Sequence, residues 1–303
     1  MAFNSDVLKA DLGERHGAEV IEPKVTLLAD DLIFGEAPRW RDDGWWLPDV
    51  FDCKLYRIDD AGRKTVMIDD LPLRPNSIGF MPDGALLLVS SAARQLLRYK
   101  DGVLRCHADL SGIGTSHLND FAIDDAGRVY IGDFGYDLHG GEAKRETHLY
   151  LVDLDGSVRI AASGIEFPNG MVLLDGGRKL VVAETWRGVL TAFDRSPTGA
   201  LSNPRLHADL GGRQPDGICA DAEGGIWVPA FNTGEVVRVL EGGAITHRIQ
   251  FEGSAVACQI GGPDGHTLLC SVYAGSMADS QANKRLGAVF TARVEVGAPQ
   301  ASV

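Results

Sequence analysis

Cysteine is scarce in this chain of 303 residues, and it shows none of the spacings that carry cysteine chemistry. The cysteines are scattered, odd in number and never arranged as Cys-x-x-Cys: Cys53, Cys106, Cys219, Cys258 and Cys270. This pattern argues against a disulfide framework and against a cysteine-based zinc site. We interpret the cysteines as small core residues of a protein in a reducing compartment.

Long apolar runs and several catalytic motifs are also missing. No run of about 18 apolar residues is present, so we expect no transmembrane helix. The N-terminal segment, residues 1–20, carries charges throughout and lacks the apolar core of a signal peptide. Neither a GxSxG motif nor a glycine-rich phosphate-binding motif occurs, which argues against a serine hydrolase and a nucleotide cofactor. We therefore expect a cytoplasmic protein that does not bind membranes.

Positive charge is the third shortage. The chain has 29 Lys and Arg residues against 42 Asp and Glu residues, which gives a formal net charge of −13 at pH 7. Nucleic-acid binding requires clustered Lys and Arg that displace counterions, so nucleic acid is not an expected partner. Negative charge of this size favours solubility, with an acidic site that prefers cations as the alternative. The composition carries no signal of oligomeric state.

What the chain does contain is a short repeated phrase that begins with an oxygen-bearing side chain. The copies begin at Glu36, Asn76, Asn119, Asn169 and Asp216. Their intervals are 40, 43, 50 and 47 residues, and most copies continue through an Asp-Gly type of turn into an apolar run. Periods of this length that carry short strands and turns are typical of propeller blades.

Short strands alternate with tight turns along the whole repeat. We predict strands at residues 86–90, 128–134, 148–155, 179–185, 226–231 and 235–240, where β-branched and aromatic residues gather between turn signals. A sixth unit follows at residues 258–275. Residues 286–296 can finish that unit or pair with residues 24–30 to close the ring, which would remove exposed sheet edges.

These signals predict an all-β fold, a six-bladed β-propeller with a metal site in its central channel. We expect the propeller over residues 23–303, after an N-terminal arm over residues 1–22. No segment reads as a convincing amphipathic helix. The alternative is a β-sandwich or a solenoid with coincidental spacing.

The first residues of the repeated phrases are candidates for one shared site, because the inner strands of a propeller line its channel. They are Glu36, Asn76, Asn119, Asn169 and Asp216, with Ala257 or Cys258 in the sixth blade. Carboxylate and amide oxygens at one level of a channel form a site for a hard divalent cation. The alternative is that each Asn-Gly or Asp-Gly is only a turn. Four copies precede apolar strands at one period, which favours the site.

At these residues the sequence resembles the SMP-30/gluconolactonase/luciferin-regenerating-enzyme family, whose structural relatives include calcium-dependent phosphotriesterases of the diisopropyl-fluorophosphatase type. The resemblance covers roughly residues 25–295 and follows the motif order blade by blade. The matching stretches are Gly35-Glu36-Ala37-Pro38-Arg39-Trp40, Arg74-Pro75-Asn76, Leu118-Asn119-Asp120, Phe167-Pro168-Asn169-Gly170, Pro215-Asp216-Gly217 and residues 258–264.

The resemblance implies one divalent metal held by Glu36, Asn169 and Asp216, with Asn119 contacting the metal or the substrate. It implies hydrolysis of a lactone, a cyclic ester, with the metal as Lewis acid and Asp216 as the base that activates water. We expect Ca²⁺, with Mg²⁺, Mn²⁺ and Zn²⁺ as alternatives. The expected partner is a small-molecule substrate.

The sequence departs from the sugar-lactonase pattern near the expected mouth of the channel. His117 stands where those enzymes often carry Arg, and residues 134–137 replace an acidic residue after the blade-three strand. With Trp186, Phe231 and Tyr273, these changes suit a flatter or less polar ligand than a simple sugar lactone. The expected substrate contacts are His117, Asn119, Asn76, Tyr136 and Trp186.

Two other functions and three residue roles stay open. The same site could cleave phosphotriesters or act on a specialised metabolite by Lewis-acid catalysis, or the propeller could be a non-catalytic binding module. Asp120 can either bond a neighbouring turn or support the ligand from behind, and Asp133 and Glu184 can each be either a structural acid or a substrate contact.

Overall fold

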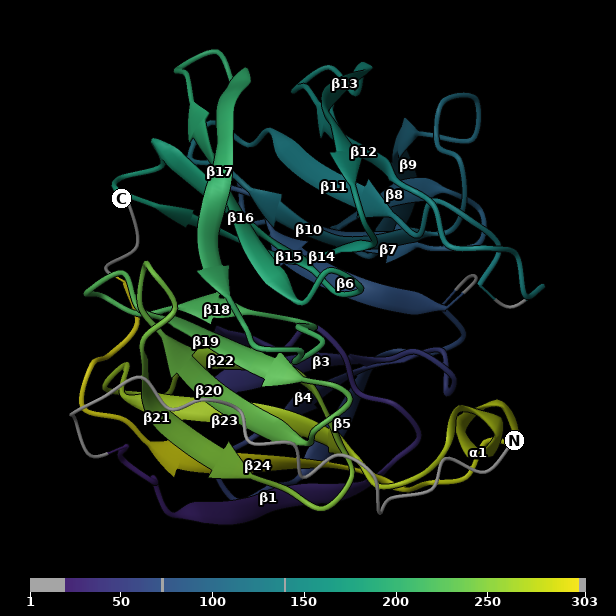
Figure 1. Ribbon diagram of the computed structural model, residues 1–303. Helices are drawn as coiled ribbons and strands as arrows, with labels where there is room; N and C mark the ends of the chain where they lie inside the picture. Colours follow the sequence, from purple (N-terminus) through teal and green to yellow (C-terminus); the bar gives the residue numbers. More distant parts are fainter. Residues whose placement is uncertain (1–19, 72–73, 139, 300–303) are drawn as a thin grey trace.

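The computed structural model describes residues 20–71, 74–138 and 140–299. Their secondary structure is almost entirely β, in six four-stranded antiparallel sheets that form a ring (Figure 1). The predicted six-bladed β-propeller is therefore confirmed. Most of the predicted N-terminal arm lies outside the described residues, although Ile21 forms a parallel bridge with His247. In the described part of the chain, no helix is long and apolar enough to span a bilayer.

The first three blades follow the chain from inner to outer strand. Blade one contains β2 (Arg39–Arg41), β3 (Gly44–Asp49), β4 (Lys54–Ile58) and β5 (Lys64–Ile68). Blade two contains β6 (Pro75–Phe80), β7 (Leu86–Ser90), β8 (Gln95–Lys100) and β9 (Val103–Asp109). Blade three contains β10 (Leu118–Ile123), β11 (Val129–Asp133), β12 (Thr147–Val152) and β13 (Val158–Ile165).

Blades four and five repeat this order, and blade six combines both ends of the described chain. Blade four contains β14 (Pro168–Leu174), β15 (Lys179–Glu184), β16 (Val189–Arg195) and β17 (Leu201–Asp209). Blade five contains β18 (Cys219–Ala220), β19 (Ile226–Ala230), β20 (Glu235–Val239) and β21 (Ile245–Gln250). Blade six contains β22 (Ser254–Gly261), β23 (Thr267–Tyr273), β24 (Gly287–Arg293) and β1 (Val25–Leu32).

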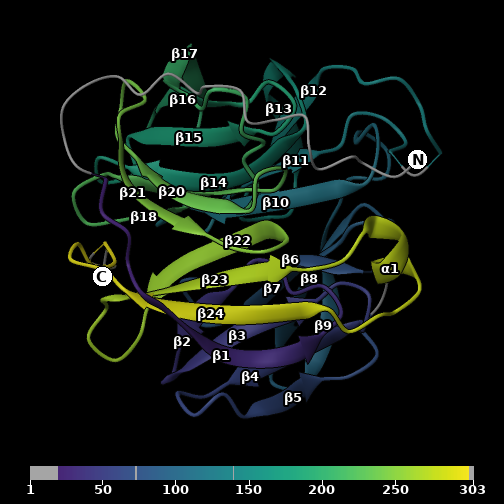
Figure 2. The ribbon, with the colours of Figure 1, turned by 60° about the horizontal axis from the view of Figure 1, so that its bottom comes forward.

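The ring closes in blade six, where β24 lies between β23 and β1 (Figure 2). Both alternatives for the C-terminal segment therefore hold, because β24 completes the blade and also pairs with the N-terminal strand. The antiparallel pairing of β1 with β24 fastens the beginning of the ring to its end. Closure of this kind leaves no open edge between the first and last blades.

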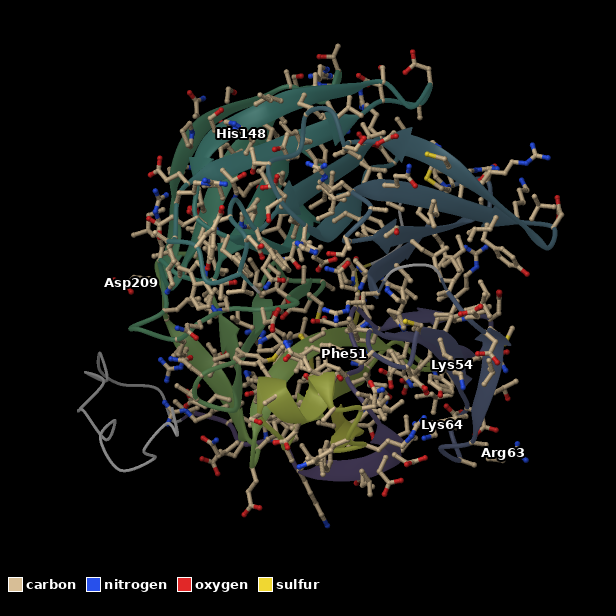
Figure 3. The ribbon with its side chains drawn as sticks, turned by 90° about the vertical axis from the view of Figure 1, so that its right-hand side faces the viewer. Phe51, Lys54, Arg63, Lys64, His148 and Asp209 are labelled. Atoms are coloured by element: carbon tan, nitrogen blue, oxygen red, sulfur yellow. The ribbon has the colours of Figure 1, made fainter. Side chains whose placement is uncertain are left out.

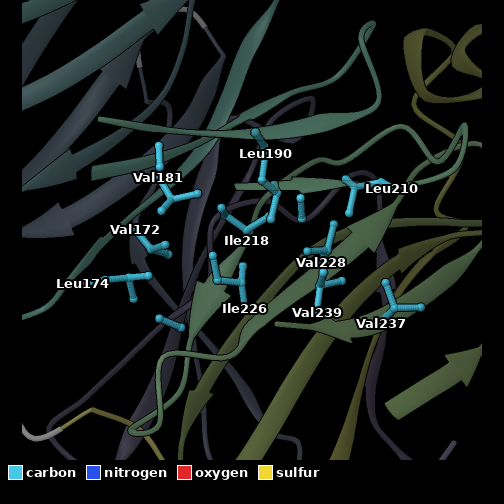
Figure 4. Packing of buried hydrophobic residues seen from close by; sticks show 14 residues of the cluster. Val172, Leu174, Val181, Leu190, Leu210, Ile218, Ile226, Val228, Val237 and Val239 are labelled. Carbon is cyan, nitrogen blue, oxygen red and sulfur yellow. The ribbon is translucent and has the colours of Figure 1, made fainter. Parts of the chain in front are cut away.

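Neighbouring blades are held together by their apolar faces. On β15, Val181 packs towards blade five, whereas Leu180 and Val182 pack towards blade three. This strand is apolar without alternation because both of its faces are covered. Figure 4 shows the contact between blades four and five, in which Val172 and Leu174 meet Ile218 and Ile226. Burial of each such side chain contributes roughly 1.5–3 kcal/mol relative to exposure.

One short helix, α1 (Met277–Gln281), interrupts blade six between β23 and β24. The sequence patterns did not single out this segment. The helix begins with a capping box. The Ser276 hydroxyl oxygen accepts a hydrogen bond from the Asp279 backbone N–H, and the Asp279 carboxylate accepts one from the Ser276 backbone N–H. Figure 3 looks onto the face that carries α1, with Phe51 near its centre and Arg63 and His148 towards its periphery.

Candidate active site

Five side chains from five different blades line a single cavity of about 460 Å³ at the end of the channel beside α1. They are the first residues of the repeated phrases: Glu36, Asn76, Asn119, Asn169 and Asp216. We call them the polar floor. Met277 and Gln281 of α1 also line the cavity. The structure thus brings together all five residues that the spacing singled out.

Each floor residue directly follows the residue that pairs with the end of its blade's second strand. These pairs are Gly35 with Asp49, Pro75 with Ser90, Leu118 with Asp133, Pro168 with Glu184, and Pro215 with Ala230. Just beyond each pair the inner strand contains one extra residue. In blade two, for example, the next paired residues after Pro75 and Ser90 are Ile78 and Leu88. Such bulges re-aim side chains, and the floor residues leave their strands at this irregularity.

The sixth blade supplies no polar residue to the floor. Its bulge lies between Ala255 and Ala257. The Gly217 N–H donates to the Val256 carbonyl as the Gly170 N–H donates to the Asp216 carbonyl, which places Val256 at the position equivalent to Asp216. The expectation of Ala257 or Cys258 was therefore wrong by one or two residues, because the bulge shifts the register. Cys258 lies elsewhere, with its Sγ 3.4 Å from Cys219 Sγ.

The glycines that follow Asn169 and Asp216 do not form turns. Neither Gly170 nor Gly217 has a positive φ angle. A Cβ atom on Gly170 would lie 2.3 Å from the Ile218 backbone nitrogen, and one on Gly217 would lie 2.8 Å from Ala257 Cβ. These glycines allow adjacent inner strands to approach closely, as shown by the Gly170 N–H donating to the Asp216 carbonyl at 3.2 Å. The turn interpretation does not apply at these two copies.

The two carboxyl groups of the polar floor have raised pKa values. Burial, then the charges of Asp216 and Asp120, raise the pKa of Glu36 well above its ordinary value. Burial and the charge of Asp120 raise the pKa of Asp216, although a 2.7 Å hydrogen bond from Asn169 Nδ2 opposes the shift. Within the described chain, neither carboxylate forms an ion pair with a Lys, Arg or His side chain. Such a pair favours either protonation or a bound cation.

The amide side chains of the floor are anchored through their nitrogens. Asn76 Nδ2 donates to the Leu118 carbonyl at 3.0 Å, and Asn119 Nδ2 donates to the Pro168 carbonyl at 2.9 Å. Asn169 Nδ2 donates to Asp216, and Asn119 Oδ1 accepts only a 3.5 Å hydrogen bond from Asn76 Nδ2, so the amide oxygens keep lone pairs for a ligand. Asn76 Oδ1 is buried and makes no hydrogen bond to any described residue.

This donor set tests whether the floor fits a metal ion. No cluster of three or more His, Cys, Asp or Glu side chains that could hold a metal occurs among the residues with described positions. An ion at the floor would therefore need amide oxygens in addition to Glu36 and Asp216. Oxygen-only donors with two carboxylates suit Ca²⁺ or Mg²⁺, so the residues present fit a hard cation.

The cavity wall follows a second regularity. In each of blades one to five, the residue that precedes the floor residue pairs with the last residue of the second strand. The wall contains the residue just before the first member of this pair and the residue just after the second member. The first set is Phe34, Arg74, His117, Phe167 and Gln214, and the second is Val50, Ser91, Phe134, Thr185 and Phe231. Backbone hydrogen bonds join the sets, as from the Phe134 N–H to the His117 carbonyl at 2.9 Å. Most of these residues were not identified from the sequence. The first set could have been found, because each of its members stands two residues before the first residue of a repeated phrase.

The predicted substrate contacts divide into two groups. His117, just before β10, and Trp186, just after β15, both line the cavity. Tyr136 does not line it: this residue is 2% exposed, and its ring centroid lies 6.3 Å from that of Phe167, behind the wall. Tyr273 is similarly buried behind Phe34. Both tyrosines support the wall instead of forming its surface, which corrects the expectation for them.

Asp133 and Glu184 hold the chain just before the inner strands. Asp133 Oδ2 accepts hydrogen bonds from the Thr115 N–H at 2.7 Å and from the Ser116 N–H at 3.3 Å. Glu184 Oε2 accepts from the Glu166 N–H at 2.8 Å and from the Arg187 guanidinium at 2.9 Å. Neither residue lines the cavity. Their role is to fix the segments that carry the wall and the floor.

Asp120 lies next to the floor without lining the cavity. It accepts hydrogen bonds from the Ser77 hydroxyl and from the Phe121 N–H, and an Arg39 nitrogen lies 4.0 Å away. Its negative charge raises the pKa of both Glu36 and Asp216. Asp120 therefore contributes to the electrostatics of the floor from the neighbouring layer.

The chain is similar to proteins with established names. A pentonolactonase of Haloferax volcanii is 28% identical over 282 residues, which cover 87% of this chain and 91% of that protein. Regucalcin of Danio rerio is 29% identical over 267 residues, covering 82% and 86%. A solved calcium-binding regucalcin of Agrobacterium tumefaciens has the same fold, with a TM-score of 0.76 and 23% identity over 93% of this chain and 97% of that chain. Residues 34–274 match the SMP-30/Gluconolactonase/LRE-like region, and the chain therefore belongs to this family.

Proposed function

We propose that the chain is a lactone hydrolase that depends on one divalent cation held by Glu36, Asn169 and Asp216, with Asn119 beside it. The observation that carries the proposal is the pair of floor carboxylates, which share one cavity, have raised pKa values and lack a cationic partner in the described chain. The similarity to a pentonolactonase supports the reaction class. The oxygen donors favour Ca²⁺, and the likeness to a solved regucalcin described as a calcium-binding protein supports that choice, with Mg²⁺, Mn²⁺ and Zn²⁺ as alternatives.

The proposed reaction is attack of water on the lactone carbonyl carbon, followed by cleavage of the bond from this carbon to the ring oxygen. A bound cation supplies Lewis-acid stabilisation of the negative charge that develops on the carbonyl oxygen. Asp216 takes the proton of the attacking water as the general base. The proton then passes to the departing ring oxygen, so the product is a hydroxy acid.

The neighbouring residues orient this base. Asn169 Nδ2 holds Asp216 Oδ1 at 2.7 Å and is itself 3.2 Å from the Thr185 hydroxyl oxygen. The other carboxylate oxygen of Asp216 is proposed to face the water. His117 stands on the wall above the floor, where its ring nitrogens suit a contact with the substrate.

The first test is proton release during lactone opening by protein that has been stripped with a chelator and then given Ca²⁺, Mg²⁺, Mn²⁺ or Zn²⁺. We expect turnover only after an ion is restored. A phosphotriester is assayed in parallel. Turnover of the phosphotriester without any lactone turnover would favour the alternative chemistry. Full lactone turnover by the stripped protein would contradict the proposed metal dependence.

Replacement of the proposed base tests the mechanism. We expect Asp216→Asn to lower kcat by about 10²–10⁴-fold, the usual contribution of a positioned general base. The matched control is Asp155→Asn, because Asp155 also precedes a glycine but lies in an exposed turn in which Gly156 has a φ of 81°. The control should keep wild-type kcat. Full activity of Asp216→Asn at saturating ion would show that another group activates the water.

A further inference from the structure

Aromatic side chains form two groups on the cavity wall above the polar floor. The first group comes from blades three and four and consists of Phe134, Phe167 and Trp186. The Phe134 and Phe167 rings stack with centroids 4.7 Å apart, and the Phe167 and Trp186 centroids are 5.0 Å apart. These contacts give one continuous aromatic surface, which His117 extends at a centroid distance of 5.9 Å from Phe134.

The second group faces the first across the channel. It consists of Phe34, Phe51 and Phe231, which belong to one apolar cluster, with the Phe34 and Phe51 centroids 6.0 Å apart. In a closed ring of six blades, blade one lies opposite blade four. Phe34 of the second group therefore stands across the cavity from Phe167 of the first.

The position of Phe167 is fixed by the surrounding structure at a cost in backbone strain. Its φ is 51°, in the left-handed region that bulky side chains rarely adopt. Residues in such conformations persist where the fold determines them, and they concentrate at binding sites. The stacked ring of Phe134 and the tilted ring of Trp186 contact Phe167 and hold its ring in place on the cavity wall.

Several polar groups on the wall already form hydrogen bonds or ring contacts within the protein. The Ser91 hydroxyl donates to the Leu118 carbonyl at 2.5 Å, and the Thr185 hydroxyl donates to the Pro215 carbonyl at 2.8 Å. The Arg74 guanidinium carbon lies 5.0 Å from the centroid of the Phe51 ring. A substrate rich in hydroxyl groups would lose water contacts against these aromatic surfaces, and each hydroxyl left without a partner costs binding free energy.

We propose that the cavity selects lactones that carry a flat aromatic ring, held between the two aromatic groups while the ester carbonyl reaches the polar floor. This inference rests on the proposed lactone hydrolysis and specifies its substrate class. Aromatic rings that stack in this way contribute to binding beyond the burial of their area. A cavity of about 460 Å³ lies within the usual size range of small-molecule sites.

The test compares two lactones with six-membered ester rings on the ion-loaded protein. Dihydrocoumarin carries a fused benzene ring, whereas glucono-1,5-lactone carries hydroxyl groups. We expect kcat/KM for dihydrocoumarin to be at least ~10-fold higher, as one aromatic contact of about 1.4 kcal/mol would give. Calorimetric binding of the aromatic product, 3-(2-hydroxyphenyl)propanoate, against gluconate gives a readout that does not need turnover, and the aromatic acid should bind more tightly.

Variants assign the preference to the wall. Phe134→Leu keeps an apolar side chain but removes the stacked ring. It should lower kcat/KM for dihydrocoumarin by about 3- to 10-fold and change kcat/KM for glucono-1,5-lactone by no more than about twofold. Phe290→Leu is the matched control, because Phe290 packs against Phe251 in blade six, away from the cavity. Phe290→Leu should leave kcat/KM unchanged for both substrates.

The outcomes separate this inference from the proposed function. A higher kcat/KM for glucono-1,5-lactone, or an equal fall for both lactones in Phe134→Leu, would overturn the aromatic preference and leave lactone hydrolysis intact. Failure to hydrolyse either lactone, with an ion bound, would overturn the proposed function and the preference with it.

Discussion

At the scale of single residues, the floor of the cavity holds two carboxyl groups that have no cationic partner in the described protein. The same fold does neutralise other buried carboxylates: Glu235, for example, accepts from Arg213 Nε at 2.8 Å and lies 3.1 Å from Arg248. Glu36 and Asp216 have no such partner in the described chain. We therefore expect their arrangement to lower the stability of the protein when no ion is bound.

This argument predicts that Glu36→Gln stabilises the ion-free protein. The folded-state pKa of Glu36 is raised, so its contribution to stability is full below the unfolded carboxyl pKa and is lost as the pH rises through the folded value. At pH 8 folding must either bury the charge of Glu36 or bind a proton there, and each costs free energy that glutamine does not incur. We expect the Tm of chelator-treated protein to rise by ~2–4 °C, which corresponds to about 1 kcal/mol in a large domain. Ion binding by calorimetry should be strongly weakened.

Glu235→Gln is the matched control, since it removes the charge of a buried glutamate that does have cationic partners. Its Tm should fall. If Glu36→Gln also lowered the Tm of the ion-free protein, Glu36 would have to be stabilised by a contact other than an ion.

At the scale of single elements, strands and turns could be read from the sequence, but the bulges could not. The strand predicted at residues 86–90 coincides with β7, and the one at 179–185 ends one residue beyond β15. Apolar β-branched runs between glycine turns carry that signal locally. The bulge in each inner strand depends on pairing with a second strand, so local patterns do not report it. The five residues of α1 are too few for a helical period, although its capping box was visible.

The floor residues were predictable and most wall residues were not, for a related reason. The floor residues Asn76, Asn119 and Asn169 each begin a phrase that leads into apolar residues, and their period makes them visible. Wall residues such as Phe34 and Val50 look like ordinary core side chains in the sequence. Only the paired register places them around the same cavity.

The close approach of the inner strands of blades four and five predicts that one added methyl group at Gly170 will destabilise the fold. In Gly170→Ala, the new Cβ atom would lie 2.3 Å from the Ile218 nitrogen and 2.7 Å from the Asp216 carbonyl oxygen. Backbone of blade five must then move, so we expect a loss of ~1–3 kcal/mol in unfolding free energy, as for overpacked cores. Ion affinity should fall too, because Asn169 and Asp216 would separate. Urea unfolding and calorimetry measure the two effects.

Gly112→Ala is the control for this prediction. A Cβ atom on Gly112 would meet no atom within 4 Å, and this glycine has no positive φ. The control should stay within about 0.5 kcal/mol of wild type. Equal stability of Gly170→Ala and Gly112→Ala would show that the blades can separate at this point without cost.

At the scale of the whole molecule, the blades are joined by apolar faces, by the closure of β1 onto β24, and by ion pairs that cross from blade to blade. Asp124, at the end of β10 in blade three, pairs with Arg128 of its own blade at 2.7 Å. It also pairs with Arg195 of blade four. All side-chain atoms of Asp124 are buried, so this carboxylate joins two blades below the surface.

These pairs predict how the ring responds to acid. Burial alone would raise the pKa of Asp124, but the hydrogen bonds from Arg128 and Arg195 outweigh burial and hold the pKa below its ordinary value. The stabilisation is therefore full above the unfolded carboxyl pKa of about 3.9 and is lost as the pH falls through the lower folded value. Asp124→Asn should cost ~3 kcal/mol at pH 7, since it leaves two guanidinium groups without their partner.

The dependence of that cost on pH distinguishes charge from packing. Urea unfolding of wild type and Asp124→Asn should differ most at neutral pH, and the difference should shrink towards pH 3 as the wild-type carboxylate takes up its proton. Asp125→Asn is the control, because Asp125 is exposed and only 3.6 Å from Arg195, so exposed pairing should contribute at most about 1 kcal/mol. A difference between wild type and Asp124→Asn that stayed constant with pH would mean that the shape of Asp124, and not its charge, joins the two blades.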